Sequence, residues 1–598
     1  MKKTIALLLV LAFAVSLFVG CKTQQVPQTS QQGTTEPAVG EETTAPVTEE
    51  KTVNKDAVFV GGWPYSTVPT GHFNMFVSNA IELKFYRELH QLPLATYVAA
   101  EDKYEPMLAK SWEISSDDTS FNVVLRDDAT WLNDDTFGAK DVWTTFMIYK
   151  LMGNPVWNYI NSVDVVSDTE VSFGIQTPTS LLLRYVLRKP IVDFATYGEY
   201  AQKVQDLMDA GADTASEEWQ ALVNDFNMYR PEFVNATGPY YLDPANVTES
   251  SVELLRNEKS FLADVVNFSK VIVYNGDVAA LTPLVLNGEV DFLTHQFPAA
   301  SMETFTGMGY SVLQVAGVDG IAVYFNEAVK PLDSKLVRQA ITYVIDRERV
   351  GELALPGVSR GTKYITGLGD TMTEKWVDTT KLIDYSVDLE KAAALLTEAG
   401  LTTKDGKWYL ADGKQFKISL QCPASWSDAS TAASEIAQQM TAFGIETTFE
   451  GIDSTMRQTN ITEGNFEMAI SFFGTGQPHP MFAFETPLLV SNANAPKGLS
   501  YSMTQDTECC GTVDLSALIA ASTAGWDLEA QKAAVQQIVY TVNETVPIIP
   551  IYTKYSKYIS SNGLRTDWGS DETLYQNSAG DDSFAVIKIL TGELASID

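Results

Sequence analysis

A strand pattern, a helix pattern and a second strand pattern follow one another over residues 415–449, and this order restricts the possible folds. Residues 415–422 (Gln-Phe-Lys-Ile-Ser-Leu-Gln-Cys) alternate between apolar and polar side chains, as a half-buried strand does. Apolar residues over 432–443 recur with helical spacing, and Gly444 stands where a helix is expected to end. The strand period returns over residues 445–449. We therefore predict a strand–helix–strand unit, which is typical of α/β folds.

Other segments support an α/β fold for the whole body of the chain. Apolar residues over 336–345 mark another helix, which Asp333 or Ser334 is placed to start. Asp405-Gly406 and Asp412-Gly413 bracket residues 407–410 and predict a small hairpin. The chain has 598 residues, of which 45% are hydrophobic, so several lobes with deep cores are expected.

The N-terminal residues predict export and anchoring. Lys2 and Lys3 precede an apolar run over residues 5–19, which is short for a membrane span and typical of a secretory signal. This run ends in Leu-Phe-Val-Gly-Cys, which resembles a bacterial lipobox with Cys21 as the lipid-modified residue. The following polar stretch is too poor in large apolar side chains to fold by itself. We expect a signal peptide at 1–20 and a lipidated, flexible tether at 21–55.

The composition excludes several classes of function. The formal net charge is −35, with 41 basic and 76 acidic residues, and this disfavours binding to nucleic acid. Four histidines leave little material for a metal site, and no cofactor motif is present. Cys509 and Cys510 are adjacent, and either could pair with Cys422 or remain free. The acidic run at 133–135 is weak support for catalysis, so we expect no enzyme, and a secreted glycosidase is the alternative of a different class.

Tryptophans in loops are the most specific candidates for ligand contact. Trp63 follows Gly61-Gly62, and Trp426 lies between the predicted strand and helix, with Asp428 two residues later. An indole beside a carboxylate suits a sugar ring, which stacks on the aromatic face while its hydroxyls bind the polar neighbour. The alternative is that each tryptophan packs in a core.

Ordered motifs over residues 56–560 resemble one family. Residues 104–112, 125–126, 131 and 139–142 follow the ordered pattern "P-x-L-A-x-S-W … L-R … W … A-x-D-V". This pattern resembles the signature of the large ABC-transporter solute-binding proteins, which bind oligopeptides, dipeptides or oligosaccharides. Further matches are Thr-Gly-Pro-Tyr at 237–240, Arg-Asn at 256–257, Gly-Glu-Val-Asp at 288–291, Phe-Asn at 325–326, Val-Arg-Gln-Ala at 337–340, Ile-Asp-Arg at 345–347 and Leu-Leu-Thr-Glu-Ala-Gly at 395–400. One departure is Asn133-Asp134, where the family has Asp-Gly.

The resemblance implies a periplasmic-binding-protein (Venus flytrap) fold, in which two α/β lobes close on a ligand beside an additional domain. On this basis we expect the first lobe at 56–90, 236–322 and 548–598, the additional domain at 91–235 and the second lobe at 323–547. Arg126, Asp141, Arg338 and Asp346 belong to the matched motifs and are expected to be structural.

The resemblance also bears on the ligand. In peptide-binding members a carboxylate after a late strand of the second lobe anchors the ligand's amino group, and the corresponding residues 470–480 contain no Asp or Glu. Residues 423–428 resemble the "P-x-G-W-x-D-W" motif of oligosaccharide-binding members. We therefore predict an oligosaccharide ligand, with an oligopeptide as the alternative. The predicted ligand-binding residues are Trp63, Phe73, Asn74, Phe325, Asn326, Trp426, Asp428, Gln477 and His479.

The resemblance finally implies partners and a location. We expect the extracytoplasmic substrate-binding component of an ABC importer, held at the membrane by lipid on Cys21 in the periplasm or at the cell surface. Its partners would be the sugar or peptide ligand and the transmembrane permease subunits, and the protein would be monomeric. No metal, cofactor or catalytic residue is expected.

Overall fold

The computed structural model describes residues 54–597 apart from 64–70, 79, 82, 296, 316, 494–495, 571–572 and 578–581. The predicted signal peptide, Cys21 and most of the tether lie outside these described residues. All described residues belong to one compact unit of the chain, which spans Val53–Asp598. None of the described helices combines the length and the apolar composition that a membrane crossing needs.

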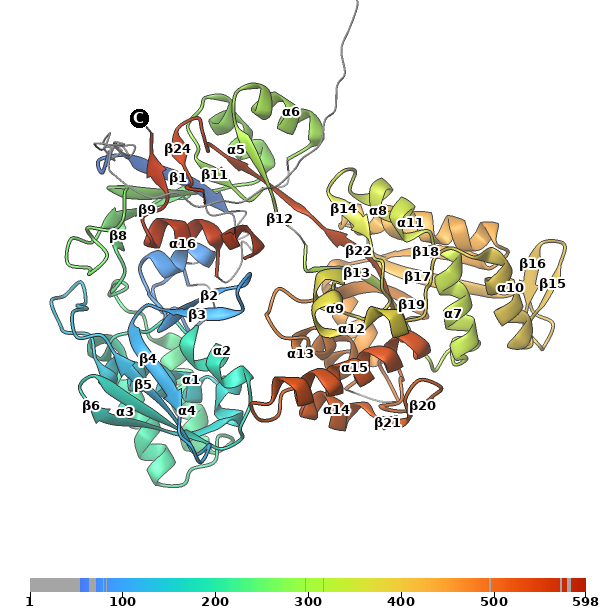
Figure 1. Cartoon of the computed structure of the whole chain (residues 1–598), viewed down its shortest axis with the longest axis horizontal. Coiled ribbons are helices and arrows are strands. Elements are labelled where there is room, and N and C mark those ends of the chain that lie inside the picture. The colour runs from blue at the N-terminus through green and yellow to red at the C-terminus, as the bar shows by residue number, and fades with distance from the viewer. Residues whose placement is uncertain are drawn as a thin grey trace, which may run out of the picture. The chain divides into compact units, whose positions relative to one another are not determined.

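A seven-stranded sheet collects strands from three distant parts of the chain (Figure 1). Its order is β12-β23-β11-β1-β10-β9-β8. The strands are β1 (Val58–Trp63), β8 (Tyr240–Val247), β9 (Ser251–Arg256), β10 (Lys270–Asn275), β11 (Phe292–Leu293), β12 (Ser311–Val315) and β23 (Ser556–Ser560). Each of the three stretches that we predicted for the first lobe supplies at least one of them.

Alternation along β1 places this sheet between two cores. Phe59 packs with α16 (Phe584–Leu590) and the 3-10 helix η1 (Lys84–Leu89) on one face, while Val60 packs with α5 (Val278–Leu286) and α6 (Ala299–Gly307) on the other. Gly61 allows η1 to approach β1 closely, because a Cβ at this position would lie 2.1 Å from the Tyr86 hydroxyl oxygen. The end of β1 is thereby held against η1, and this positions Trp63.

A six-stranded sheet forms the second lobe, with order β14-β22-β13-β19-β17-β18. Its strands are β13 (Asp319–Phe325), β14 (Ser359–Gly361), β17 (Lys417–Pro423), β18 (Glu446–Ile452), β19 (Met468–Gly474) and β22 (Ile548–Lys554). Residues Ile321, Val323 and Phe325 face the core that contains α7 (Lys335–Val344) and α11 (Ser427–Ala442), whereas Ala322 and Tyr324 face α15 (Leu528–Thr545). The chain passes between the two large sheets twice, from β12 to β13 and from β22 to β23. The boundary that we predicted at 547–548 lies before β22, so this strand of the second sheet falls within a stretch that we had predicted for the first lobe.

The additional domain contains a four-stranded antiparallel sheet of order β4-β5-β7-β6. Its elements are β4 (Ala109–Ile114), β5 (Ser120–Leu125), β6 (Ile160–Ser167), β7 (Glu170–Ile175), α1 (Ala139–Leu151), α2 (Leu181–Leu187), α3 (Phe194–Asp209) and α4 (Glu217–Met228), with the short β2 (Ala95–Val98), β3 (Lys103–Pro106) and η2 (Pro155–Asn158) beside them. Asp141 supports the start of α1, because its carboxylate accepts hydrogen bonds from the Trp131 indole (3.0 Å) and the Gly138 amide (2.8 Å). Asp134 takes a positive φ of 73°, so it supplies the turn for which the family uses glycine.

The remaining described elements connect these layers. They are α8 (Arg347–Ala354), α9 (Asp370–Trp376), η3 (Thr379–Lys381), α10 (Leu389–Glu398), β15 (Thr402–Lys404), β16 (Lys407–Tyr409), η4 (Ser454–Met456), α12 (Arg457–Glu463), α13 (Met481–Phe484), the π-helical η5 (Glu485–Val490), β20 (Thr504–Thr507), β21 (Gly511–Asp514), α14 (Leu515–Ala521), β24 (Thr566–Asp567), η6 (Thr573–Gln576) and β25 (Ala595–Ser596). The predicted strand–helix–strand unit is confirmed as β17–α11–β18, and the predicted hairpin as β15–β16.

Candidate functional site

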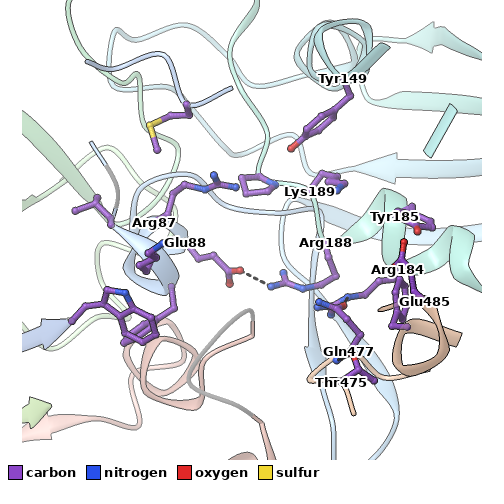
Figure 2. A pocket seen from close by; sticks show the side chains of 17 residues that line it. Arg87, Glu88, Tyr149, Arg184, Tyr185, Arg188, Lys189, Thr475, Gln477 and Glu485 are labelled. Carbon is purple, nitrogen blue, oxygen red and sulfur yellow. Dashed lines mark hydrogen bonds and ion pairs between the residues drawn. The ribbon is translucent and has the colours of Figure 1, made fainter. Parts of the chain in front are cut away.

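A cavity of about 600 Å³ is lined by residues of both lobes and the additional domain (Figure 2). The first lobe contributes Trp63 and η1, and the additional domain contributes the end of α2. The second lobe contributes Thr475, Gln477, Phe482 and Glu485, which follow β19. Loops after strands of α/β sheets are common ligand sites, and this volume lies within the usual range for ligand pockets.

Cationic side chains dominate this cavity, although the chain as a whole is acidic. Lys84 and Arg87 come from η1, and Arg184, Arg188 and Lys189 come from α2 and its end. Arg184 and Arg188 are four residues apart, so they lie on one face of the helix, and buried leucines on the other side hold α2 in the domain core. The described lining thus holds five cationic side chains and two carboxylates, Glu88 and Glu485.

Arg184 on α2 and Arg188 at the C-cap of this helix are fixed by buried carboxylates. Arg184 Nη1 lies 2.5 Å from Asp582 Oδ2, and Arg188 Nε also pairs with Asp582. Arg188 Nη2 lies 2.5 Å from Glu88 Oε1. All four side chains are at most 10% exposed. This network ties the C-terminal segment, α2 and η1 together under the cavity and fixes the direction of both guanidinium groups.

Two other charges of the cavity lack such partners. Arg87 is half-buried and Glu485 is exposed. Neither side chain makes a hydrogen bond or an ion pair with any residue that the structure describes. They come from η1 and η5, which belong to different lobes (Figure 2). A ligand with one anionic and one cationic end can therefore meet an opposite charge at each end.

Polar and aromatic groups complete the contact between the additional domain and the second lobe. Arg184 Nε donates to Gln477 Oε1 at 3.0 Å, and the Tyr185 and Phe482 rings meet edge to face with centroids 6.4 Å apart. Desolvation raises the pKa of Tyr185 to about 12, so its phenol stays neutral and can donate or accept a hydrogen bond. Outside the cavity, Lys375 Nζ lies 2.9 Å from Asp102 Oδ2 and joins the same two parts of the chain.

Comparison with known proteins agrees with this architecture. A family model described as "Bacterial extracellular solute-binding proteins, family 5 Middle" matches residues 103–495, which is more than half of the chain. The chain belongs to this family. It is therefore a substrate-binding component of an ABC importer and not an enzyme, and the family is extracellular or periplasmic.

Individual relatives of this solute-binding protein differ in what they bind. A dipeptide-binding protein of Lactococcus lactis subsp. cremoris is 25% identical over 426 residues, which cover 62% of this chain and 69% of the relative. A periplasmic oligopeptide-binding protein of Thermotoga maritima has a TM-score of 0.71 at 18% identity and covers 91% of this chain and 99% of its own. A structure of that protein with bound mannohexaose has a TM-score of 0.64, with the same identity and coverage. At this identity the structures support the two-lobed fold alone.

Two of the ligand-binding residues that the sequence predicted, Trp63 and Gln477, line the cavity. The Trp63 indole packs edge to face on Phe85, with ring centroids 4.9 Å apart. Phe73 packs against the core of the first lobe, and Asn74 is fully buried. The Asn74 side chain donates to the Phe226 and Tyr229 carbonyls at 3.3 Å, so its amide already has partners.

Three predicted residues of the second lobe lie in its interior and do not line the cavity. Phe325 is completely buried, and Asn326 donates to the carbonyls of Gly464 (3.0 Å) and Phe466 (2.8 Å). His479 is buried edge to face against Trp376, with centroids 4.9 Å apart, and desolvation lowers its pKa to about 4. Their roles as ligand contacts stay predictions.

Trp426 and Asp428 form a separate group at the start of α11. The Trp426 ring lies 5.1 Å from the ring of Phe472, which is 43% exposed, and the Arg457 guanidinium lies 5.4 Å from the Trp426 ring and 5.0 Å from that of Phe472. Asp428 pairs with Lys554 at 2.5 Å. This aromatic–cationic group is partly exposed, and it does not contribute to the cavity described above.

The cationic residues of the cavity were not identified from the sequence. A signal was available, because residues 184–189 (Arg-Tyr-Val-Leu-Arg-Lys) hold three cations and no acid in a chain of net charge −35. Glu485 was missed because it lies just beyond residues 470–480, in which no carboxylate occurs. The structure brings it to the cavity on the turn after α13. Among the described residues, no group of His, Cys, Asp and Glu could hold a metal ion.

Proposed function

We propose that this solute-binding protein captures a short peptide and presents it to the permease of its importer. The observation that carries the proposal is the pair of opposite charges in the cavity, Arg87 from the first lobe and Glu485 from the second. A peptide has a carboxylate at one end and an ammonium group at the other. Charged groups in a partly closed cavity bind strongly when each meets an opposite charge, and they are costly to bury otherwise.

The rest of the cavity suits a peptide backbone and its side chains. Gln477, Thr475 and Tyr185 offer donors and acceptors for amide groups, and Trp63, Phe85 and Phe482 offer apolar surface. A peptide that binds groups of both lobes favours the closed arrangement over the open one, because only the closed arrangement gives both sets of contacts. The closed protein would then deliver the peptide to the permease.

An oligosaccharide, which the sequence analysis placed first, is the second candidate. The partly exposed Trp426 and Phe472 rings support it, since sugar rings stack on such surfaces. A structural neighbour with bound mannohexaose also supports it. A neutral sugar would not use the charges of Arg87 and Glu485, and for this reason we place the peptide first.

We further propose that Cys21 carries the lipid anchor and that residues 21–55 are the tether. The lipobox-like sequence before Cys21 supports this assignment. Cys21→Ser should move the protein from the membrane fraction to the soluble fraction. Equal membrane association of both proteins would refute the anchor.

The test of the ligand class is a calorimetric comparison of di- to pentapeptides with neutral oligosaccharides of similar size. Peptides should bind, and amidation of the C-terminus or acetylation of the N-terminus should weaken binding at least tenfold, because each removes one end charge. Arg87→Gln should remove the effect of amidation, and Glu485→Gln that of acetylation. Glu390→Gln, an exposed change on α10, serves as the control. Binding of neutral sugars without binding of any peptide would overturn the proposal.

A further inference from the structure

Two adjacent cysteines stand in the turn between β20 and β21, and the proposed function does not use them. The turn connects Thr507 to Gly511, so Cys509 and Cys510 lie at the tip of a short hairpin. Cys509 is exposed and Cys510 is partly exposed, whereas Cys422 is buried in the core of the second lobe, and all three are free thiols. Of the cysteines that the structure describes, this pair is therefore the one that reagents in solution can reach.

The two thiols of this pair lie in contact with each other. The Cys509 and Cys510 Sγ atoms are 2.8 Å apart, and Cys509 Sγ also lies 3.6 Å from Thr507 Oγ1. A disulfide bond is about 2.0 Å long, so a movement of less than about 1 Å would bring the sulfurs to bonding distance. The pair is therefore placed to form a bond within its own turn.

A nearly buried carboxylate holds the backbone of this turn. Glu544, near the end of α15, accepts hydrogen bonds from the amides of Glu508 (3.0 Å) and Cys509 (3.1 Å). Its side chain is 8% exposed and also pairs with Lys335 of α7 at 2.7 Å. Because the turn is fixed to two helices of the second lobe, the thiols stay close to each other as long as this lobe is folded.

A bond between neighbouring cysteines differs from a structural disulfide in its strain. Consecutive Cα atoms are about 3.8 Å apart across a trans peptide, whereas the Cα atoms of bonded cysteines are usually roughly 4.4–6.8 Å apart. This short separation distorts the bond and makes it easier to reduce, and strained or exposed disulfides are the labile and regulatory ones. The bond would also close a loop of only two residues, so it would add little stability as a crosslink. A disulfide in this turn therefore suits a reversible role.

We propose that Cys509 and Cys510 form a redox-sensitive modification site, at which a vicinal disulfide closes and opens with the thiol–disulfide balance of the surroundings. Disulfides persist outside the cytoplasm, and the family is extracellular or periplasmic. Neither cysteine lines the cavity, so this site is separate from the proposed peptide site.

The oxidant in this reaction is another disulfide, carried by a small molecule or by a protein. The thiolate of one cysteine attacks the oxidant, whose S–S bond breaks and releases one thiolate as a mixed disulfide forms. The second cysteine then loses its proton, attacks the sulfur of the first and releases the other thiolate. Each released thiolate takes up a proton that a cysteine has lost. Two cysteine thiols are thus oxidised to one disulfide, and the oxidant is reduced to two thiols.

Mass spectrometry after treatment with oxidised glutathione tests this site on the full exported protein. The sample is quenched with acid, unfolded and alkylated with iodoacetamide. The peptide that contains both cysteines of the pair should have lost two hydrogen atoms and carry no alkyl group, and excess reduced glutathione should restore two alkylated cysteines. Full alkylation after the oxidant, or a bond to a second chain, would overturn the proposal. A pair that stays oxidised in reduced glutathione would overturn its reversibility.

Single variants separate the bond within the turn from other thiol reactions. In Cys509→Ser and in Cys510→Ser the remaining thiol has no neighbour that can displace glutathione, so each variant should keep at least tenfold more glutathione adduct than the unmodified protein. Thr504→Ser, an exposed change on β20 that leaves both cysteines in place, should behave like the unmodified protein. Equal amounts of adduct in all four proteins would overturn the ring-closing step. Because the pair lies outside the cavity, such a result would leave the proposed function intact.

Discussion

Replacing Asp582 by Asn should destabilise the protein strongly, because this carboxylate balances two buried guanidinium groups. Its side chain is 5% exposed, and those of Arg184 and Arg188 are 9% and 5% exposed. An Asn side chain has nearly the same shape and no charge. The variant would therefore keep the packing and remove the one negative charge that both arginines share, in a region that water reaches poorly.

The size of the effect follows from the burial of the network. Removal of one partner from a buried ion pair costs about 3–5 kcal/mol, which lowers the ratio of folded to unfolded protein by roughly a hundredfold to several thousandfold. Asp582 also accepts a hydrogen bond from the Tyr97 amide (3.2 Å), which an Asn oxygen can still accept. The predicted loss therefore comes from the charge.

Urea unfolding followed by tryptophan fluorescence would measure this change, and the chain contains eleven tryptophans. Asp127→Asn is the matched control, because Asp127 pairs with Lys110 at 2.5 Å on the surface, where their side chains are 69% and 52% exposed. Exposed pairs contribute little to stability. If Asp582→Asn lost no more free energy of unfolding than Asp127→Asn, the buried network would not have the role described here.

Three further predictions concern titration, thiol reactivity and the aromatic group of the second lobe. Desolvation lowers the pKa of His90 to about 3 and that of His479 to about 4. The unfolded chain therefore binds protons on these histidines at a higher pH than the folded chain, and the free energy of unfolding should fall as pH drops below about 6.5. Melting temperatures measured from pH 7.5 to 4.5 should fall less steeply for His90→Gln than for the unmodified protein, and equal slopes would contradict this prediction. Burial raises the pKa of Cys422 to about 12, so iodoacetamide should leave it unmodified in the native protein at pH 8 and modify it in urea, as mass spectrometry can show. Trp426→Ala should leave peptide affinity within about twofold and weaken any oligosaccharide binding by about 1–3 kcal/mol; a tenfold loss of peptide affinity would place Trp426 in the peptide site.

Sequence patterns of short range predicted local structure well. The helix at 336–345 is present as α7, with Ser334 at its N-cap, and the strand–helix–strand unit at 415–449 is present as β17–α11–β18. Both patterns depend on which side chains face a core within a few turns or residues, and this information is local. The family resemblance extended these units to the two-lobed fold, which the comparisons confirm.

The cavity depends on contacts that no local pattern contains. Arg184 and Asp582 are 398 positions apart, and Arg184 and Gln477 are 293 apart, yet they meet in one network. The absence of a carboxylate at 470–480 led the sequence analysis toward a sugar, whereas the fold brings Glu485 to the cavity from the next turn. The alternation of apolar residues and the ordered motifs determined the α/β class and the family, because these follow from core packing along each segment. The charges that can meet a ligand were decided by tertiary structure, because Arg87 and Glu485 stand on opposite sides of the crossing from β12 to β13 and nevertheless line one cavity.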